Sequence, residues 1–471
     1  MTAAPKTSPP GLSPAKQALL LRRLRGNDGR RRATIPRRPP GTPAPLSFAQ
    51  RRMWFLEQLE PGSGAFNIPL ALRLRGPLDP DRLDRAWDAV CARHEALRTT
   101  FAADGDDQIQ VIAEPAPRGI PRLDLSDLPV AAREARVREV AQRDMREPLD
   151  LTEGPLWRAR LVRLADDDHV FILVVHHSIS DEHSTRILLS DLATGYAGQE
   201  IPEPAVQYAD VALWQRERLS PERVARQVAY WRETLAGAPP LLDLPTDHPR
   251  PPVQSPAGGM VYRQAPAELS RRLDALATAE SATPFMTLLA AYAVLLARYC
   301  GQDDLTVGVP VAGRDAPELE RVVGCLLNTL VLRLRLEGEP TFRDLLRRTR
   351  RTVLDAFGHA ELPFEQLVEQ LRPERSLAHA PLYQAMFNLI GGDDAAGPAL
   401  PGLVVEHLDG VSLETTKSDL SLTVTRRPGG LSVLLLYRRE LFEPATAEDL
   451  TDRYLALLEA VAEDPDRCWL D

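Results

Sequence analysis

The stretch Val170–Ser184, read VFILVVHHSISDEHS, decides the fold prediction. Its first six residues are apolar and mostly β-branched, which is typical of a short buried strand. The run stops at His176 and His177, and after Asp181 apolar residues recur at helical spacing as far as Tyr196. Two histidines therefore lie where a strand ends and a helix is about to begin. In α/β folds, ligands commonly bind at this edge.

The stretch alone leaves three interpretations of the histidine pair open. The commonest role of a histidine at a strand end is that of a satisfied polar residue. A metal site would use His176, His177, Asp181 and His183, but no cysteine lies nearby and the spacing is not that of structural zinc sites. The third interpretation is a catalytic base, because a neutral imidazole with a pKa of about 6.5 can accept a proton.

Composition indicates two domains or two large lobes without a membrane span. The chain has 471 residues, and no apolar run approaches the roughly 18 residues of a transmembrane helix. Residues 1–40 carry ten Lys or Arg and one acid, so the net charge of −9 leaves −18 on the remainder. That acidic body argues against nucleic acid as a partner. Four scattered cysteines and the absence of a signal-peptide core predict a cytoplasmic location.

The order of predicted elements divides the chain into four parts. Residues 1–44 form a basic, disordered linker with a short helix at 13–26, rich in Arg and Pro. An N-terminal lobe with the histidine motif spans 45–238, and a Pro-, Asp- and Gly-rich connection spans 239–259. A C-terminal lobe spans 260–471. Each half mixes strands with helices, so we predict an α/β pseudo-dimer with a cleft between its halves.

Seven segments, in one order from about residue 45 onward, resemble the motifs of the condensation domain of non-ribosomal peptide synthetases. They are Ser47–Leu56, Arg93–Phe101 (RHEALRTTF), His176–Glu182, Tyr208–Trp214, Val323–Thr329, Leu362–Glu365 and Arg375–Leu382. HHxxxD alone is only moderately specific, because other acyltransferases carry similar motifs, but seven segments in one order are highly specific. The third segment departs from the family: Glu182 replaces glycine, giving HHxxxDE.

The resemblance implies two chloramphenicol acetyltransferase-like lobes that form a V around a central tunnel. It also implies donor and acceptor peptidyl carrier proteins as partners, together with neighbouring synthetase domains. Each carrier presents a thioester on a 4'-phosphopantetheine arm, and no cofactor or metal is bound tightly. The acceptor amine attacks the donor thioester, which is acyl transfer in antibiotic and other secondary-metabolite biosynthesis.

The resemblance also implies roles for single residues. His177 is the active-site residue and orients or deprotonates the amine, whereas His176 supports the loop. Asp181 forms a structural ion pair with an arginine, for which Arg98 stands at the matching position. Arg93 belongs to the same supporting segment.

Glu182 and Asn328 leave alternatives open. Asn328 either donates a hydrogen bond in the tunnel or is a turn residue. A carboxylate at position 182 is electrostatically favoured near a helix start. It would also narrow the tunnel or add an acid/base group, and if it faced His177 each group would stabilise the charged form of the other.

Three functions follow from this departure. The first is condensation, with Glu182 pointing away from the reaction. The second is dehydration of a carrier-bound Ser or Thr to a dehydroamino acid, with His177 or Glu182 taking the α-proton. The third is a non-catalytic docking platform for a tailoring enzyme, against which the intact His-His-Asp set argues. A heterocyclising subtype and a free-standing acetyltransferase are disfavoured, the latter because such enzymes usually need one lobe.

Overall fold

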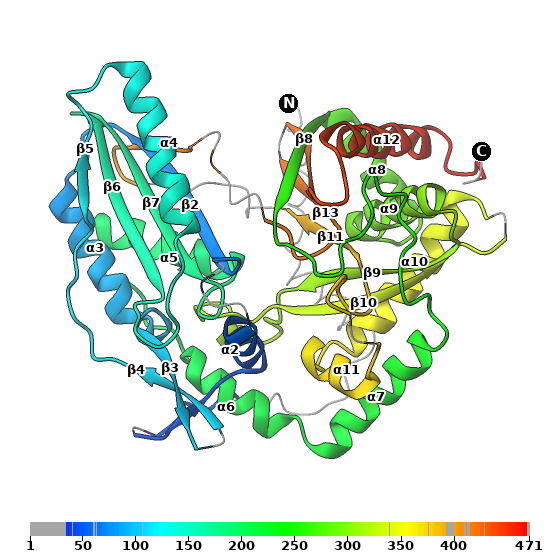
Figure 1. Cartoon of the computed structure of the whole chain (residues 1–471), viewed down its shortest axis with the longest axis horizontal. Helices are drawn as coiled ribbons and strands as arrows, with labels where there is room; N and C mark the ends of the chain where they lie inside the picture. The colour runs from blue at the N-terminus through cyan, green and yellow to red at the C-terminus, as the bar shows by residue number, and fades with distance from the viewer. Residues whose placement is uncertain are drawn as a thin grey trace, which may run out of the picture.

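The computed structural model describes residues 34–39, 41–59, 62, 64–105, 107–338, 340–374, 376–391, 400–408, 411, 415–427 and 429–468. The predicted helix at 13–26, most of the basic linker and Arg375 of the last motif lie outside these residues. The described chain is a mixed α/β fold, as predicted, with two large sheets and one small one. In Figure 1 the two large sheets lie on opposite sides of the molecule, and α6 (Tyr208–Arg218) and α7 (Pro221–Leu235) run along the bottom between them.

The N-terminal large sheet has five strands in the order β12-β2-β7-β6-β5. Its strands are β2 (Asn67–Arg75), β5 (Arg122–Asp124), β6 (Trp157–Ala165), β7 (Asp168–His176) and β12 (Val404–His407). The central strand β7 pairs antiparallel with both β2 and β6. It contains the predicted strand, extended by two residues at the start and one at the end.

The apolar run of β7 is buried because helices cover both faces of the sheet. Val170, Ile172 and Val174 pack in one cluster with the buried face of α4 (Val130–Arg146). Phe171, Leu173 and Val175 pack on the other side with α3 (Pro80–Arg93) and α5 (Glu182–Tyr196). Burial on both sides explains why this strand reads as a continuous apolar run rather than an alternating one.

The small sheet lies beside this layer in the order β1-β4-β3. It comprises β1 (Ala44–Pro45), β3 (Thr99–Asp104) and β4 (Asp107–Ile112). The 3-10 helix η1 (Glu95–Arg98) leads into β3, and α2 (Phe48–Leu59) follows β1.

The C-terminal sheet has six strands in the order β10-β9-β11-β13-β14-β8. They are β8 (Gly258–Pro266), β9 (Asp304–Val311), β10 (Asn328–Arg335), β11 (Ala385–Ile390), β13 (Leu420–Arg427) and β14 (Gly430–Arg438). Its helices are α8 (Ala267–Ala279), α9 (Pro284–Cys300), α10 (Phe342–Gly358), α11 (Phe364–Leu371) and α12 (Pro444–Glu463), and a short 3-10 helix, η2 (Pro317–Leu319), follows β9. Residues 286–297 of α9 are buried throughout, which places this helix in the centre of the C-terminal core.

Two segments cross the predicted boundary between the halves. β12 comes from the C-terminal part of the chain, yet it pairs antiparallel with β2, with Val404 opposite Arg75. In the other direction, Val228 and Trp231 of α7 are buried in the C-terminal core, although the sequence placed α7 in the N-terminal lobe. The halves are therefore interlocked by exchanged segments.

Within the described ranges, no single helix is both long enough and apolar enough to cross a membrane. α8 and α9 meet those limits only when taken together, with a bend of 102° between them.

Candidate functional site

His176 is the last residue of β7 and is 3% exposed. The Ser178 backbone N–H donates to its Nδ1 at 3.2 Å, so Nδ1 carries no proton in this arrangement. Burial, reinforced by the positive charges that His177 and Lys417 can carry, lowers the pKa of His176 to about 3. His176 is therefore a neutral residue whose ring contacts the turn after β7.

His177 is anchored from both its backbone and its ring. Its backbone N–H donates to the Phe66 carbonyl oxygen at 2.8 Å, and Nδ1 lies 2.8 Å from the Ser180 carbonyl oxygen. A carbonyl only accepts hydrogen bonds, so Nδ1 carries the proton and the lone pair is on Nε2. Burial first, and the Lys417 charge second, lower the pKa of His177 to about 4. The ring is thus neutral at pH 7, with one nitrogen available as an acceptor.

Asp181 is fully buried and caps the N-terminus of α5. Its carboxylate accepts from Ser184 N at 2.7 Å, from Ser184 Oγ at 2.7 Å and from Leu326 N at 3.1 Å. Arg314 Nη2 lies 3.0 and 3.1 Å from its two oxygens. Burial alone would raise the pKa of Asp181, but the Arg314 charge and these donors outweigh it and the pKa is lowered.

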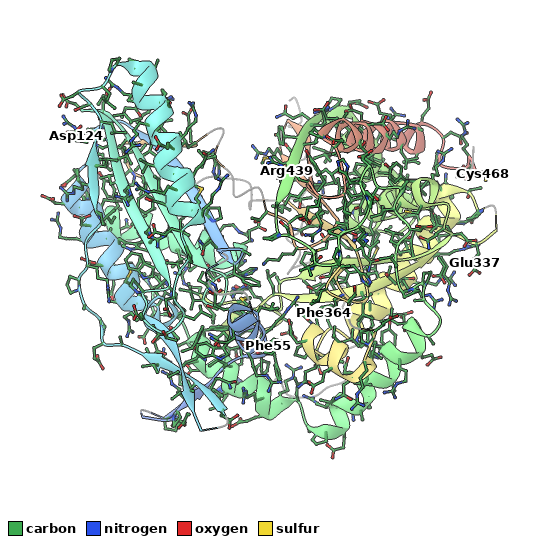
Figure 2. The ribbon with its side chains drawn as sticks, in the orientation of Figure 1. Phe55, Asp124, Glu337, Phe364, Arg439 and Cys468 are labelled. Carbon is green, nitrogen blue, oxygen red and sulfur yellow. The ribbon has the colours of Figure 1, made fainter. Side chains whose placement is uncertain are left out.

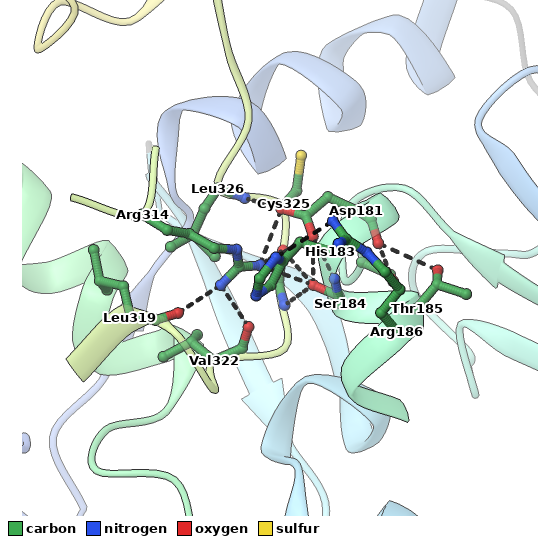
Figure 3. Close-up of polar contacts among 12 residues, drawn as sticks. Asp181, His183, Ser184, Thr185, Arg186, Arg314, Leu319, Val322, Cys325 and Leu326 are labelled. Carbon is green, nitrogen blue, oxygen red and sulfur yellow. Dashed lines mark hydrogen bonds and ion pairs between the residues drawn. The ribbon is translucent and has the colours of Figure 1, made fainter. Parts of the chain in front are cut away.

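The partner of Asp181 is Arg314, in the loop after β9, and the predicted pair with Arg98 is wrong. Figure 3 shows the Arg314 guanidinium between Asp181 and two carbonyl oxygens, those of Leu319 at 2.7 Å and Val322 at 2.8 Å. The Arg314 side chain is 1% exposed, so this pair joins the two halves inside the protein.

Arg98 is not the partner of Asp181, because its guanidinium donors are used at the C-terminal end of α3. The guanidinium of Arg98 donates to the carbonyl oxygens of Cys91, Ala92 and Ala113. It thereby satisfies carbonyl groups left unpaired where α3 ends. Arg93, the last residue of α3, is half-buried, and its carbonyl oxygen accepts from Gln207 Nε2 at 3.0 Å. Arg93 thus contacts the start of α6, while Arg98 binds the end of α3 and the segment after β4.

Glu182 is the first residue of α5 and is exposed. A carboxylate in the first helical turn is favoured by the helix dipole, which agrees with the expectation that the backbone tolerates it. Its neighbour His183 turns toward the C-terminal half, where Nε2 lies 3.0 Å from the Glu320 carbonyl oxygen. No group of three His, Cys, Asp or Glu residues in the described part of the chain is arranged to hold a metal.

Asn328 uses its whole amide on the protein backbone. Nδ2 donates to the carbonyl oxygens of Ala360 and Leu362, at 3.0 and 2.8 Å. Oδ1 accepts from Thr329 N at 2.8 Å and from Phe364 N at 2.9 Å. These contacts favour the structural role over hydrogen bonding to a substrate, because they fix the loop that precedes α11.

The first, fourth and fifth motifs converge beside the histidines. Tyr208 Oη lies 2.7 Å from Ser47 Oγ and 2.6 Å from the Cys325 carbonyl oxygen, which links the first, fourth and fifth motifs. Cys325 Sγ lies 3.6 Å from His177 Nδ1. Gly324 packs directly on Tyr208, and a Cβ there would lie 2.3 Å from the tyrosine ring.

A second contact between the halves joins α2 to α11. Arg52 Nη1 lies 3.1 Å from Glu365 Oε1, and its guanidinium carbon is 5.5 Å from the centre of the Phe364 ring. Figure 2 shows the labelled Phe55 of α2 and Phe364 of α11 in the lower middle of the molecule, on the facing sides of the two halves. Phe55 is 60% exposed.

Sequence reasoning missed four residues of this site: Phe66, Arg314, Cys325 and Lys417. Each lies far from the histidines in the sequence and approaches them only through the fold. Cys325 lies in the predicted fifth motif, so the sequence identified its segment but not its contact with His177. The other three carried no local signal, because nothing in the sequence around a single Arg, Lys or Phe shows which distant residue it contacts.

A family model described as "Condensation domain" matches residues 42–468. A linear gramicidin synthase of Brevibacillus parabrevis is 44% identical over 435 residues, which is 90% of this chain and 8% of that protein. Phosphinothricin tripeptide synthetase PhsC of Streptomyces viridochromogenes is 41% identical over 467 residues, which is 96% of this chain and 42% of that protein. The chain thus spans less than half the length of these relatives.

Solved structures agree in fold. The X-domain from teicoplanin biosynthesis superposes with a TM-score of 0.83 at 31% identity, covering 93% of this chain and 99% of that one. The same X-domain in complex with OxyB superposes equally well, at 30% identity. The family match, the identity to peptide synthetases and the shared fold agree over nearly the whole described chain, and the protein therefore belongs to the condensation-domain family of non-ribosomal peptide synthetases.

Proposed function

We propose that this chain forms an amide bond between a donor acyl or peptidyl thioester and an acceptor aminoacyl thioester. Each substrate would arrive on the 4'-phosphopantetheine arm of a donor or acceptor carrier protein. The observation that carries the proposal is the tautomer of His177, whose Nδ1–H is held by the Ser180 carbonyl. Nε2 is left as a hydrogen-bond acceptor for an attacking amine.

The reaction requires a hydrogen-bond acceptor at Nε2, because the attacking amine loses a proton. The amine nitrogen attacks the thioester carbonyl carbon, a C–N bond forms, and the carbonyl electron pair moves to oxygen. The C–S bond then breaks, and the departing thiolate takes up the proton that the amine loses. His177 orients the amine through Nε2 and passes the proton on. Its pKa of about 4 makes it a weak base, so orientation is its larger contribution.

Glu182 supports a second candidate, dehydration of a carrier-bound Ser or Thr. The carboxylate is exposed and five residues beyond His177, where the family has glycine. His177 or Glu182 would remove the α-proton, the Cα=Cβ bond would form, and the β-hydroxyl would leave as water. This activity and condensation differ in whether water is lost before any acceptor is present.

The similarity to the X-domain supports a third candidate, a docking platform for a tailoring enzyme. That domain has been solved in complex with OxyB. The present chain keeps the His-His-Asp set with its hydrogen bonds, and a pure platform has no need of them.

The test is intact-protein mass spectrometry of a carrier loaded with a peptidyl thioester that ends in Ser, with and without an aminoacyl acceptor carrier. We expect transfer to the acceptor, no loss of water from the donor alone, and a fall of about 10²–10⁴-fold in the transfer rate for His177→Ala. Glu182→Gly is the matched control and should retain transfer.

Two outcomes would contradict condensation as the whole function. Loss of one water from the donor before the acceptor is added would establish dehydration, and its loss in His177→Ala or in Glu182→Gly would identify the base. No change on either carrier, with several donors and a folded protein, would favour the docking platform.

A further inference from the structure

Lys417 is the single lysine in the described part of the chain. The sequence has three lysines against fifty-four arginines, and the other two, Lys6 and Lys16, lie in the N-terminal tail. Wherever else the described chain needs a positive side chain it uses arginine. A lysine differs from arginine in carrying a compact ammonium whose pKa shifts readily when it is enclosed.

The segment that carries Lys417 is fixed to the C-terminal half. Its neighbours Thr416, Ser418 and Asp419 are all buried, whereas Lys417 is exposed. Thr416 Oγ1 donates to the Ser418 carbonyl oxygen at 2.8 Å, and Arg250 Nη2 lies 2.6 Å from Asp419 Oδ2. Lys417 is therefore the side chain that points outward from a rigid turn just before β13.

This side chain reaches across to the N-terminal half. Lys417 Nζ lies 4.6 Å from the centre of the Phe66 ring, a cation–π contact. Phe66 is also the residue whose carbonyl oxygen accepts the backbone N–H of His177, and its ring lies 6.1 Å from that of His176. A positive charge from one half is thus placed next to the residue that anchors the catalytic histidine of the other.

The electrostatics agree with this placement. The positive charge of Lys417 contributes to the lowered pKa of both His176 and His177. Burial, together with the nearby Arg52 guanidinium, lowers the pKa of Lys417 itself to about 8, while the Cys325 thiol acts in the opposite direction. The side chain still reaches solvent, while the atoms packed around it remove part of the hydration that would favour the charged form.

We propose that Lys417 is a further charged residue of the condensation site, and that its ammonium stabilises the negative charge that develops on the thioester oxygen. The inference rests on the proposed condensation activity. When the C–N bond forms, the carbonyl electron pair moves to oxygen, and a cation positioned beside that oxygen favours the change. The same charge disfavours an imidazolium at His177, so Nε2 stays open to the amine.

The first test compares single-turnover transfer between loaded carriers. Lys417→Met removes the charge and keeps the length of the side chain, and we expect the rate to fall by about 10²–10³-fold, the usual cost of losing one such donor. Lys417→Arg should stay within about tenfold of the parent. Arg427→Met, at the exposed far end of β13, is the matched control for loss of one positive charge and should not change the rate.

The pH profile separates an electrostatic role from a packing role. With a pKa of about 8, the Lys417 ammonium is lost as the pH rises, so the parent rate should decline above pH 8. Arginine stays protonated in that range, so Lys417→Arg should lose this decline. The charged and titratable groups that face the ammonium are Arg52, Cys325 and the histidine pair. If the transfer rate of Lys417→Arg declined above pH 8 as the parent rate does, the proposal would be overturned.

Two readouts need no turnover and separate failure of this inference from failure of condensation itself. Lys417 is the single lysine beyond the tail, so peptide-resolved acetylation against pH reports its own pKa, which we expect near 8. NMR titration of His177 in the parent and in Lys417→Met should show a higher pKa in the variant. An unchanged His177 pKa overturns the inference whether or not the domain condenses. A parent that shows this coupling but transfers nothing overturns the proposed function.

Discussion

At the scale of single residues, the site combines groups that hold the turn with His177, which we propose faces the substrates. The polar side-chain atoms of His176 and Asp181 form hydrogen bonds to neighbouring groups of the protein. The His177 ring uses Nδ1 for a hydrogen bond to the Ser180 carbonyl oxygen, which leaves Nε2 as an acceptor. The Ser180 backbone carbonyl thereby sets the tautomer that the proposed reaction requires.

Asp181→Asn should destabilise the fold, so a loss of activity in this variant would not by itself show a catalytic role. The substitution leaves Arg314 as an uncompensated buried charge, and breaking a pair of this kind costs about 3–5 kcal/mol of unfolding free energy. Urea unfolding of Asp181→Asn, Arg314→Met and the double variant measures it, and the double variant should be less destabilised than the sum of the two. A fully stable but inactive Asp181→Asn would contradict a structural role.

The buried histidines should make stability depend on pH between about pH 4 and 6.5. His176 has a pKa of about 3 in the folded state and His177 about 4, whereas unfolded histidines titrate near 6.5. The unfolded chain binds more protons in this window, so stability falls as the pH falls, by up to about 1.4 kcal/mol per unit and per histidine. Asp181, with its lowered pKa, adds its own loss only below about pH 4.

Urea unfolding of His176→Asn across that window should show a shallower slope than the parent. His248→Asn, at an exposed position, is the control for the same substitution outside the buried site. An identical slope in His176→Asn would mean that His176 is protonated in the folded protein.

At the scale of elements, loops from different parts of the chain meet around β7. The loop before β10 brings Gly324 and Cys325 against α6, and the Tyr208 ring fills the space that a side chain at Gly324 would need. Here the close approach of the tyrosine ring, rather than a special backbone angle, requires glycine.

Gly324→Ala should lower stability by about 1–3 kcal/mol, the usual cost of forcing an extra methyl group into a packed interior. The new Cβ would displace the Tyr208 ring and loosen its hydrogen bonds to Ser47 and Cys325. Gly429→Ala is the control, because nothing lies within 4 Å of a Cβ there. Equal thermal midpoints for the two variants would contradict this account.

The elements that the sequence predicted well are those with local signals. The six apolar residues from Val170 and the helical spacing after Asp181 depend only on neighbours in the chain, and β7 and α5 appear where expected. The partner of Asp181 could not be predicted in this way. Arg314 is 133 residues further on, and only the fold shows that it is buried while Arg98 turns to the end of α3. Lys417 was missed for the same reason.

At the scale of the whole molecule, the two halves are interlocked rather than simply apposed. β12 joins the N-terminal sheet, α7 packs in the C-terminal core, and the buried Asp181–Arg314 pair crosses between them. A carrier-bound substrate that contacts His177 and Lys417 together would contact both halves. The relative position of the halves should therefore matter to the reaction as much as either half alone.

This interlocking predicts that the halves unfold as one cooperative unit. Calorimetry of the parent should give one transition with matching calorimetric and van't Hoff enthalpies, because unfolding one half exposes the exchanged segment and the charged partner of the other. Arg314→Gln should lower the midpoint by several degrees and still give one transition, since it removes the buried link but leaves the exchanged segments in place. Arg52→Gln is the matched control: its pair with Glu365 also joins the halves, but the Arg52 side chain is 42% exposed, where such pairs contribute at most about 1 kcal/mol. Two transitions already in the parent would mean that the exchanged segments do not couple the halves, and reaction at a shared site would then depend on the substrates to bring the halves together.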